Sequence, residues 1–188
     1  MAKAATKAAG KPKAAKAKAP PRWQDALYDQ LRGLGVTQFC YVPDAGHSAL
    51  IDRSLADPEA HSVALTTEEE GVAVLAGAHL GGAKGVLLMQ SSGVGNCVNF
   101  FSLIGHGHFP FLTLVSMRGD YGEGNPWQMF MGERVPAILE TCGIRCIRGE
   151  DAADVPRAVA AAATMTWQSG SACALLLTQK LLGAKAFA

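Results

Sequence analysis

Residues 65–80 read Leu-Thr-Thr-Glu-Glu-Glu-Gly-Val-Ala-Val-Leu-Ala-Gly-Ala-His-Leu, so three carboxylates open a segment of small and aliphatic side chains. Thr67 is a favourable N-cap, and Glu70 stands three residues later, where a capping box places its acid. Carboxylates also suit the positive end of a helix dipole. The stretch therefore predicts a helix that begins after Thr67.

The body of this helix predicts close packing on several sides. Val72, Leu75, Ala76 and His79 recur at helical spacing and form one predicted face. Most other positions are Gly or Ala, which let neighbouring backbone approach closely. We expect a buried helix whose acidic start points toward a ligand or a second chain.

Length and composition predict one domain preceded by a tail. The 188 residues are 49% hydrophobic, enough for a core. Residues 1–21 are almost only Ala, Lys, Pro and Gly, which predicts disorder, and residues 22–188 are expected to form the domain. Residues 1–22 carry seven of the 17 basic residues and no acid, which leaves a net charge of −6 on the rest. No aromatic residues are interleaved with these lysines, so nucleic-acid binding is not favoured.

The cysteines and the hydropathy pattern indicate a protein of the reducing cytoplasm. The chain has five scattered cysteines, an odd number without a disulfide framework. The closest pair, Cys142 and Cys146, favours packing over a metal or redox role. No apolar run reaches the length of a membrane span, and the N-terminus lacks the apolar region of a secretory signal. We therefore expect buried thiols, a cytoplasmic location and no membrane partner.

Strand-like runs alternate with helical segments from Trp23 onward. Six strands are predicted at Thr37–Val42, Val63–Leu65, Gly85–Met89, Phe111–Met117, Ile144–Ile147 and Cys173–Leu177. Helices are predicted at Trp23–Gly33, near 46–55, after Thr67, after Asn96 to about 105 and near 132–142. A last, Ala-rich helix is predicted from a cap at Asp151 or Asp154 to about Trp167. Strands that are apolar on both faces imply a six-stranded, mainly parallel sheet in a three-layer α/β/α fold.

Polar residues follow the predicted strands at the edge where such folds bind ligands. They are Pro43, Asp44 and His47 after the first strand, Thr67 and Glu68 after the second, Gln90, Gly93, Gly95 and Asn96 after the third, and Arg118, Asp120 and Asn125 after the fourth. The pattern predicts one rim that carries the chemistry.

Short motifs at this rim do not define a ligand by themselves. Gly93-Val94-Gly95-Asn96 joins a strand to a helix as phosphate loops do, but it lacks the Walker A lysine and the last glycine of GxGxxG. A tight turn that another molecule or subunit can approach is favoured. His106 and His108 lack further ligands, so no metal site is predicted in this chain alone. A flavodoxin-like nucleotide-binding module stays an alternative on fold analogy.

Several blocks, in order along the chain, resemble the pyrimidine-binding domain of thiamine-diphosphate-dependent 2-oxo-acid decarboxylases. They are Val42-Pro43-Asp44, Thr67-Glu68, Val72-Ala73, Ala76-Gly77, His79-Leu80, Met89-Gln90-Ser91-Ser92-Gly93-Val94-Gly95-Asn96-Cys97-Val98-Asn99, Met117-Arg118-Gly119-Asp120, and Asn125-Pro126-Trp127-Gln128-Met129 with Met131-Gly132. The resemblance covers roughly 23–182. It is strongest to the members that act on sulfopyruvate, which have a separate alpha subunit, and to the N-terminal domain of those that act on phosphonopyruvate.

The resemblance implies a catalytic role for Glu68. Matching the family's Ala-Gly and His-Leu blocks to Ala76-Gly77 and His79-Leu80 puts its catalytic acid at Glu68, and a shift by one residue breaks both matches. In the family this acid hydrogen-bonds N1′ of the cofactor's aminopyrimidine, and the cofactor accepts the electrons released as CO₂ leaves. By the same resemblance Gln90, Gly93 and Asn96 border the pyrimidine, and Asp44 and His47 lie toward the substrate.

Arg118 is our prediction for the residue that binds the second anionic group of such a substrate, because a guanidinium pairs well with oxyanions. A surface arginine at the end of a strand is the alternative interpretation.

The metal-binding half of the family's site is missing from the sequence. That half holds Mg²⁺ with a Gly-Asp-Gly motif and an Asn at a distance from it. This chain has Gly119-Asp120-Tyr121, in which the third residue differs, and its Asn125 follows after too short a gap. The resemblance therefore implies a beta subunit that supplies the Mg²⁺ and diphosphate contacts, in a homo- and hetero-oligomer with the active site at the interface. A non-catalytic assembly or regulatory subunit with the same fold stays the alternative.

Overall fold

The computed structural model describes residues 22–184, and they are built around one sheet. Its strands are β1 (Val36–Tyr41), β2 (His61–Ala64), β3 (Lys84–Gln90), β4 (Phe111–Ser116), β5 (Ile144–Gly149) and β6 (Ala172–Leu177). They lie in the order β2-β1-β3-β4-β6-β5, and every neighbouring pair is parallel. The predicted six-stranded parallel sheet is confirmed. The disorder predicted for residues 1–21 concerns a segment outside the described residues.

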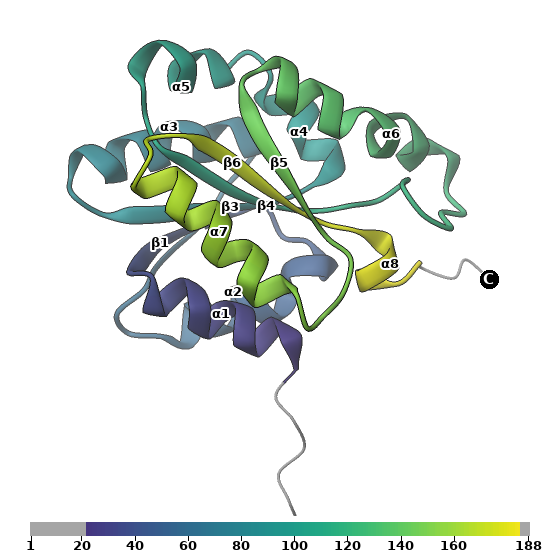
Figure 1. The fold of residues 1–188 in the computed structure, drawn as a ribbon, viewed down its shortest axis with the longest axis horizontal. Helices are drawn as coiled ribbons and strands as arrows, with labels where there is room; N and C mark the ends of the chain where they lie inside the picture. The colour runs from purple at the N-terminus through teal and green to yellow at the C-terminus, as the bar shows by residue number, and fades with distance from the viewer. Residues whose placement is uncertain (1–21, 185–188) are drawn as a thin grey trace, which may run out of the picture.

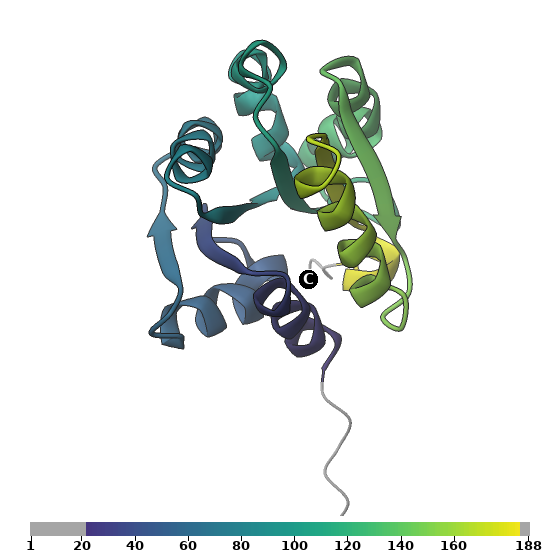
Figure 2. The same cartoon turned by 60° about the vertical axis from the view of Figure 1, so that its left-hand side comes forward.

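Helices cover both faces of the sheet (Figures 1 and 2). They are α1 (Trp23–Gly33), α2 (Ser48–Ala56) after a short 3₁₀ turn η1 (Ala45–His47), α3 (Glu68–Leu80), α4 (Ser91–Cys97), α5 (Phe101–Gly107), α6 (Pro126–Thr141), α7 (Val155–Trp167) and α8 (Gln179–Leu182). Helices α1, α2 and α7 pack on one face, and α3 to α6 pack on the other. The predicted three-layer architecture is therefore present.

The central strands supply both hydrophobic cores at once. In β3, Val86 and Leu88 pack with α1, α2 and α7, while Leu87 and Met89 pack with α3 to α6. All four side chains are fully buried. Because successive strand side chains point to opposite faces, a strand covered on both sides needs an unbroken apolar run. No helix within residues 22–184 is long and apolar enough to cross a membrane.

The predicted tight turn at residues 93–96 is wrong, because α4 already begins at Ser91. Two glycines among its seven residues disfavour this helix in isolation. Val94 and Cys97 are fully buried one turn apart, and Gly93 packs against Glu68. Tertiary packing thus overrides the low helix propensity of this segment.

Helix α6 begins six residues earlier than predicted. Pro126 occupies its first position, where the missing N–H costs nothing, and the Asn125 side chain accepts a hydrogen bond from Trp127 N at 3.1 Å. The Asn-Pro pair is the sequence signal for this start.

The start of α3 differs in detail from the predicted capping box. Thr67 is the N-cap residue, but its hydroxyl bonds to the Glu69 carboxylate instead of a backbone N–H. Glu70 Oε2 accepts from Thr66 N at 2.9 Å, one residue before the cap. Glu69 and Glu70 therefore serve the helix start, as predicted, through different bonds.

Helix α3 is buried on one side only. Val72, Leu75 and Ala76 are buried as predicted, whereas His79 and Gly77 are exposed. Because small residues occur all around the helix, the sequence pattern gives little information about which side of α3 faces the sheet. The outer side of α3 is left bare and available to another molecule.

Candidate functional site

The site lies where the strand order reverses. The chain leaves β1 toward the edge strand β2, and it leaves β3 in the opposite direction toward β4. Ligands of open parallel sheets bind at the carboxyl ends of such neighbouring strands. Asp44 follows β1 and Gln90 ends β3, and Gln90 Nε2 donates to Asp44 Oδ1 at 3.1 Å. This hydrogen bond joins the two sides of the switch point.

Glu68 is held at this edge by contacts with α4. It is the first residue of α3, and it is 8% exposed. Asn96 Nδ2 donates to Glu68 Oε2 at 2.8 Å. A Cβ on Gly93 would lie 2.4 Å from Glu68 Cδ, so the absence of a side chain there makes room for the carboxylate. The structure thus brings together Glu68, Gly93 and Asn96.

A small cavity opens at the Glu68 carboxylate. Its volume is about 130 Å³, and its lining combines the apolar Val42 and Pro43 with the polar Asp44, Glu68, Gln90 and Ser92. Within residues 22–184, Asn96 gives the one hydrogen bond that reaches the Glu68 side chain. The carboxylate is therefore oriented, and it keeps acceptor capacity for a ligand.

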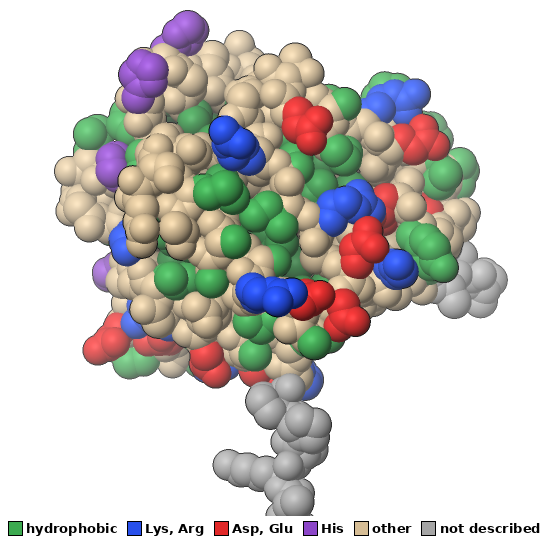
Figure 3. Space-filling model, viewed as in Figure 1, with side chains coloured by type: hydrophobic (Ala, Val, Ile, Leu, Met, Phe, Trp, Pro, Cys, Tyr) green, Lys and Arg blue, Asp and Glu red, His purple; other side chains and the backbone are tan. Residues whose placement is uncertain are grey.

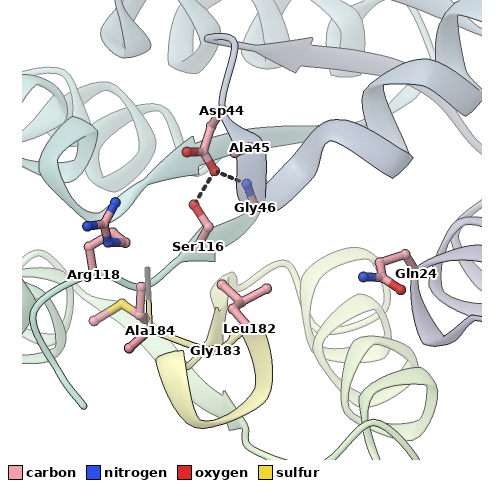
Figure 4. Close-up of a pocket in the computed structure, with 10 residues that line it drawn as sticks. Gln24, Asp44, Ala45, Gly46, Ser116, Arg118, Leu182, Gly183 and Ala184 are labelled. Atoms are coloured by element: carbon pink, nitrogen blue, oxygen red, sulfur yellow. Dashed lines mark hydrogen bonds between the residues drawn. The ribbon is translucent and has the colours of Figure 1, made fainter. Parts of the chain in front are cut away.

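Asp44 separates this cavity from a larger one of about 370 Å³. Besides Gln90, its carboxylate accepts from Gly46 N at 3.0 Å and from Ser116 Oγ at 2.6 Å (Figure 4). These donors come from three different strand ends, so Asp44 is fixed in one orientation. The sequence reasoning missed Ser116, although it ends β4 at the same rim.

Arg118 lines the larger cavity together with Asp44 and Ser116 (Figure 4). Its Nε and Nη2 donate to Glu123 at 2.6 and 2.9 Å, and the Glu123 side chain is completely buried. Hydrogen bonds from Arg118, then from the Asn125 amide and from Gln179, lower the pKa of Glu123 to about 2 against the opposing effect of burial. A buried carboxylate thus holds the guanidinium in place.

His47 lies beneath the turn after β1 and does not line either cavity. It is fully buried, and Nε2 contacts Met89 O at 3.2 Å. Its Nδ1 has no partner among the described residues. Burial lowers the pKa of the ring despite the nearby Asp44 charge. Because a carbonyl oxygen can only accept, Nε2 is the donor in the contact with Met89 O.

The acidic residues of the loop after β4 are occupied by this chain's own groups. Asp120 accepts from Gln179 N at 3.1 Å and from Arg148 at 3.3 Å, while Asn125 caps α6. Between residues 22 and 184, no three His, Cys, Asp or Glu side chains are grouped to hold a metal ion. His106 and His108 end α5, which precedes β4 and lies away from the rim.

Sequence comparison relates the chain to decarboxylases and decarboxylase subunits, although no family model matches it. Sulfopyruvate decarboxylase subunit alpha of Methanococcus maripaludis is 37% identical over 121 residues, 64% of this chain and 72% of that protein. Its counterpart from Methanothermobacter thermautotrophicus is 32% identical over 154 residues, 81% and 93% of the two chains. Phosphonopyruvate decarboxylase of Streptomyces viridochromogenes is 38% identical over 114 residues, 60% of this chain but 29% of that protein.

Solved structures agree on the fold. A 2-oxoglutarate:ferredoxin oxidoreductase from Magnetococcus marinus superposes with a TM-score of 0.70 at 14% identity, over 86% of this chain and 29% of that one. A putative thiamin diphosphate-dependent enzyme from Mycobacterium smegmatis gives 0.64 at 17% identity, over 84% and 30%. The architecture is that of one domain type of thiamine-diphosphate-dependent enzymes. From the sequence identities, the chain belongs to the sulfopyruvate decarboxylase alpha-subunit family.

Proposed function

We propose that this chain is the pyrimidine-binding alpha subunit of a thiamine-diphosphate-dependent decarboxylase. Its substrate is an anionic 2-oxo acid of the sulfopyruvate or phosphonopyruvate type, which it converts to CO₂ and an aldehyde with a diphosphate-binding beta subunit. The observation that carries the proposal is the Glu68 carboxylate, held by Asn96 and Gly93 at the switch-point cavity. Sulfopyruvate and phosphonopyruvate are the substrates in the names of the relatives.

The residues present fit the aminopyrimidine of thiamine diphosphate. Glu68 is nearly buried and pre-oriented, and α4 lacks a side chain where the carboxylate lies. We assign Glu68 as the group that shares a proton with N1′ of the pyrimidine, while Gln90, Gly93 and Asn96 border the ring. When bound, the cofactor supplies the electron sink for decarboxylation. Asn96 holds Oε2, so the other carboxylate oxygen of Glu68, Oε1, is the one left to meet the ligand.

Asp44 and Arg118 are proposed for the substrate side of the site, whereas the fully buried His47 lines neither cavity and is proposed only as a support for the turn after β1. Asp44 is fixed by three donors and faces both cavities. Arg118 is proposed to meet the second anionic group of the substrate at the wall of the larger cavity. His47 supports the turn that carries Asp44 from below, through its contact with Met89.

Charge at the rim favours a partner that brings cations. The rim residues described above include more acidic than basic side chains. The acids are Asp44, Glu68, Asp120 and Glu123, and the bases are Arg118 and Arg148. A doubly charged substrate and a diphosphate therefore need positive charge from elsewhere, which we assign to Mg²⁺ and the beta subunit. Figure 3 shows basic and acidic side chains interspersed on the face it displays, without the single-sign surface typical of nucleic-acid binding.

The beta subunit is proposed to cover the outer side of α3 to α6. Large apolar side chains are exposed there, namely Leu80, Val98, Phe100, Leu103, Trp127, Met129 and Phe130. Large apolar side chains left exposed on one side of a domain favour an interaction surface there. We also propose that the resulting hetero-oligomer is cytoplasmic, since all five cysteines are free thiols.

Trp127→Ser is expected to weaken binding of the beta subunit without affecting the free chain. Trp127 is 88% exposed at the start of α6, so its removal leaves the core intact. A buried tryptophan at an interface contributes about 2 kcal/mol or more, which corresponds to roughly a 30-fold rise in Kd. Calorimetric titration with the beta subunit measures this change. The control is Leu55→Ser on α2, at the opposite face, and equal Kd values for both variants contradict the proposed interface.

The function is tested by co-expressing the chain with a diphosphate-binding subunit whose sequence carries Gly-Asp-Gly followed by a distant Asn. The purified complex is expected to release CO₂ from sulfopyruvate or phosphonopyruvate only when thiamine diphosphate and Mg²⁺ are present. A complex that assembles and binds the cofactor, yet releases no CO₂ from either acid, supports the assembly or regulatory alternative instead.

A further inference from the structure

A buried glutamine amide organises the loop that carries Arg118. Gln179 is the first residue of α8 and is 1% exposed. Its Oε1 accepts hydrogen bonds from three successive backbone amides, those of Gly119, Asp120 and Tyr121, at 2.8, 3.1 and 3.2 Å. Consecutive N–H groups that converge in this way form a nest suited to an anion. Here a neutral amide oxygen fills it.

The other end of the same amide meets a carboxylate. Gln179 Nε2 donates to Glu123 Oε2 at 2.9 Å, and the same oxygen accepts from Arg118 Nε at 2.6 Å. The second Glu123 oxygen accepts from Arg118 Nη2 and from Asn125 N, both at 2.9 Å. Of the polar side chains of this length, only an amide offers an acceptor to the nest and a donor to the carboxylate. A glutamate in its place can accept from the three backbone amides but has no N–H to donate to Glu123.

The backbone of Arg118 is fixed independently of Gln179. Ser91 Oγ accepts from Arg118 N at 3.1 Å and donates to Arg118 O at 3.2 Å. The loop also touches α6, because a Cβ on Gly132 would lie 2.1 Å from Arg118 O. The remaining freedom of Arg118 is the direction of its guanidinium, which Glu123 sets and Gln179 stabilises.

We infer that Gln179 is a positioning residue which, through Glu123, directs the Arg118 guanidinium toward the substrate's second anionic group. Arg118 lines the larger cavity beside Asp44, and the end of α8 forms another part of that wall (Figure 4). The inference rests on the proposed substrate-binding role of Arg118. It makes the turn after β6 part of the selectivity of the site, although Gln179 itself touches no substrate.

Gln179→Glu is expected to impair selectivity for anionic substrates in the assembled enzyme. The new carboxylate keeps the three N–H bonds, but its second oxygen faces Glu123 without a proton between them, so Glu123 moves and Arg118 turns. KM for sulfopyruvate rises about tenfold, as for a loss of about 1.4 kcal/mol in binding. The value of kcat changes little, and KM for pyruvate, which lacks the second anion, stays as in the wild type.

The pH dependence of the Gln179→Glu variant distinguishes positioning from a general loss of structure. One proton shared between the introduced carboxyl and Glu123 restores the missing donor, and like-charge repulsion raises the apparent pKa of such a pair. The KM defect relative to wild type therefore shrinks as the pH falls. The other charges that face this position are Arg118, Asp120 and, through Asp120, Arg148.

Two further variants make the outcomes decisive. Thr178→Val removes the bond from Thr178 Oγ1 to Gly149 O in the same turn without touching the loop, so it lowers stability and leaves KM for sulfopyruvate unchanged. Arg118→Met tests the proposed role of Arg118 alone. If Arg118→Met keeps wild-type selectivity, that role fails. Positioning by Gln179 is refuted if Arg118→Met loses selectivity while Gln179→Glu and Gln179→Leu retain wild-type KM values. It is also refuted if Gln179→Glu behaves like Thr178→Val, with lower stability and an unchanged KM for sulfopyruvate.

Discussion

Glu68→Gln is expected to abolish decarboxylation by the assembled enzyme and to leave the fold unchanged. The glutamine is isosteric and can still accept from Asn96 Nδ2, whose bond to Glu68 measures 2.8 Å. In that orientation an NH₂ group replaces the second carboxylate oxygen, so the side chain offers N1′ of the pyrimidine no acceptor and only an N–H donor whose proton it does not transfer. Loss of a positioned acid–base group lowers kcat by about 10²–10⁴-fold.

The neighbouring acid provides a matched control for this experiment. Glu69→Gln makes the same charge change one residue later, at a side chain that bonds to the Thr67 hydroxyl. Each acid interacts with the helix dipole by about 0.3–1 kcal/mol, so both variants lower the stability of the free chain by similar small amounts. Steady-state CO₂ release and thermal unfolding measure the two effects. Wild-type turnover by Glu68→Gln, or an equal loss in Glu69→Gln, refutes the assignment.

The fold was predictable because the strands carry their own evidence. The run Val86–Met89 is apolar at successive positions, which is stable only when both faces of a strand are covered. All six strands were predicted, with boundaries within a few residues of the observed ones. The rim followed from the fold, since parallel strands place their carboxyl ends together. That rule predicted Asp44, Gln90 and Glu68 at one rim, and in the structure all three line the same cavity.

Long-range contacts account for what the sequence did not reveal. Glu123 and Gln179 are 56 residues apart, and neither stands in a motif, so nothing local indicates that their side chains meet. The Ser91–Cys97 helix was missed for the same reason, because it is stabilised by packing on α6, α3 and β3 and not by the helix propensity of its own residues. His79 fits the helical spacing of the apolar face, yet spacing alone does not determine which side of an all-small helix meets the sheet.

Gly93→Ala is expected to lower kcat by about 10²-fold while the free chain becomes as stable as the wild type or more so. An added Cβ would lie 2.4 Å from Glu68 Cδ and 2.5 Å from Oε1, so the carboxylate has to move. A displacement of about 1 Å at a reacting group costs about 10²-fold in rate. Alanine within a helix is more stable than glycine by about 0.5–1 kcal/mol, which offsets the cost of moving Glu68. Activity and thermal unfolding measure the two effects separately.

Gly95→Ala is the control within the same helix. Its Cβ would meet Met131 Cε at 3.3 Å, the end of a flexible side chain that adjusts at little cost. Gly95→Ala is expected to become more stable by the difference in helix propensity between alanine and glycine, and to keep wild-type kcat. A Gly93→Ala enzyme that retains the wild-type rate contradicts the placement of the working carboxylate against α4.

The combination of the two substitutions shows whether Gly93 acts through Glu68. If the added Cβ lowers the rate only by displacing the Glu68 carboxylate, then Gly93→Ala costs little further activity in a Glu68→Gln background. Groups that act as a unit are strongly non-additive in this way. If the two losses multiply instead, Gly93 has an effect independent of Glu68, and the close approach of α4 serves the cofactor ring itself and not the acid.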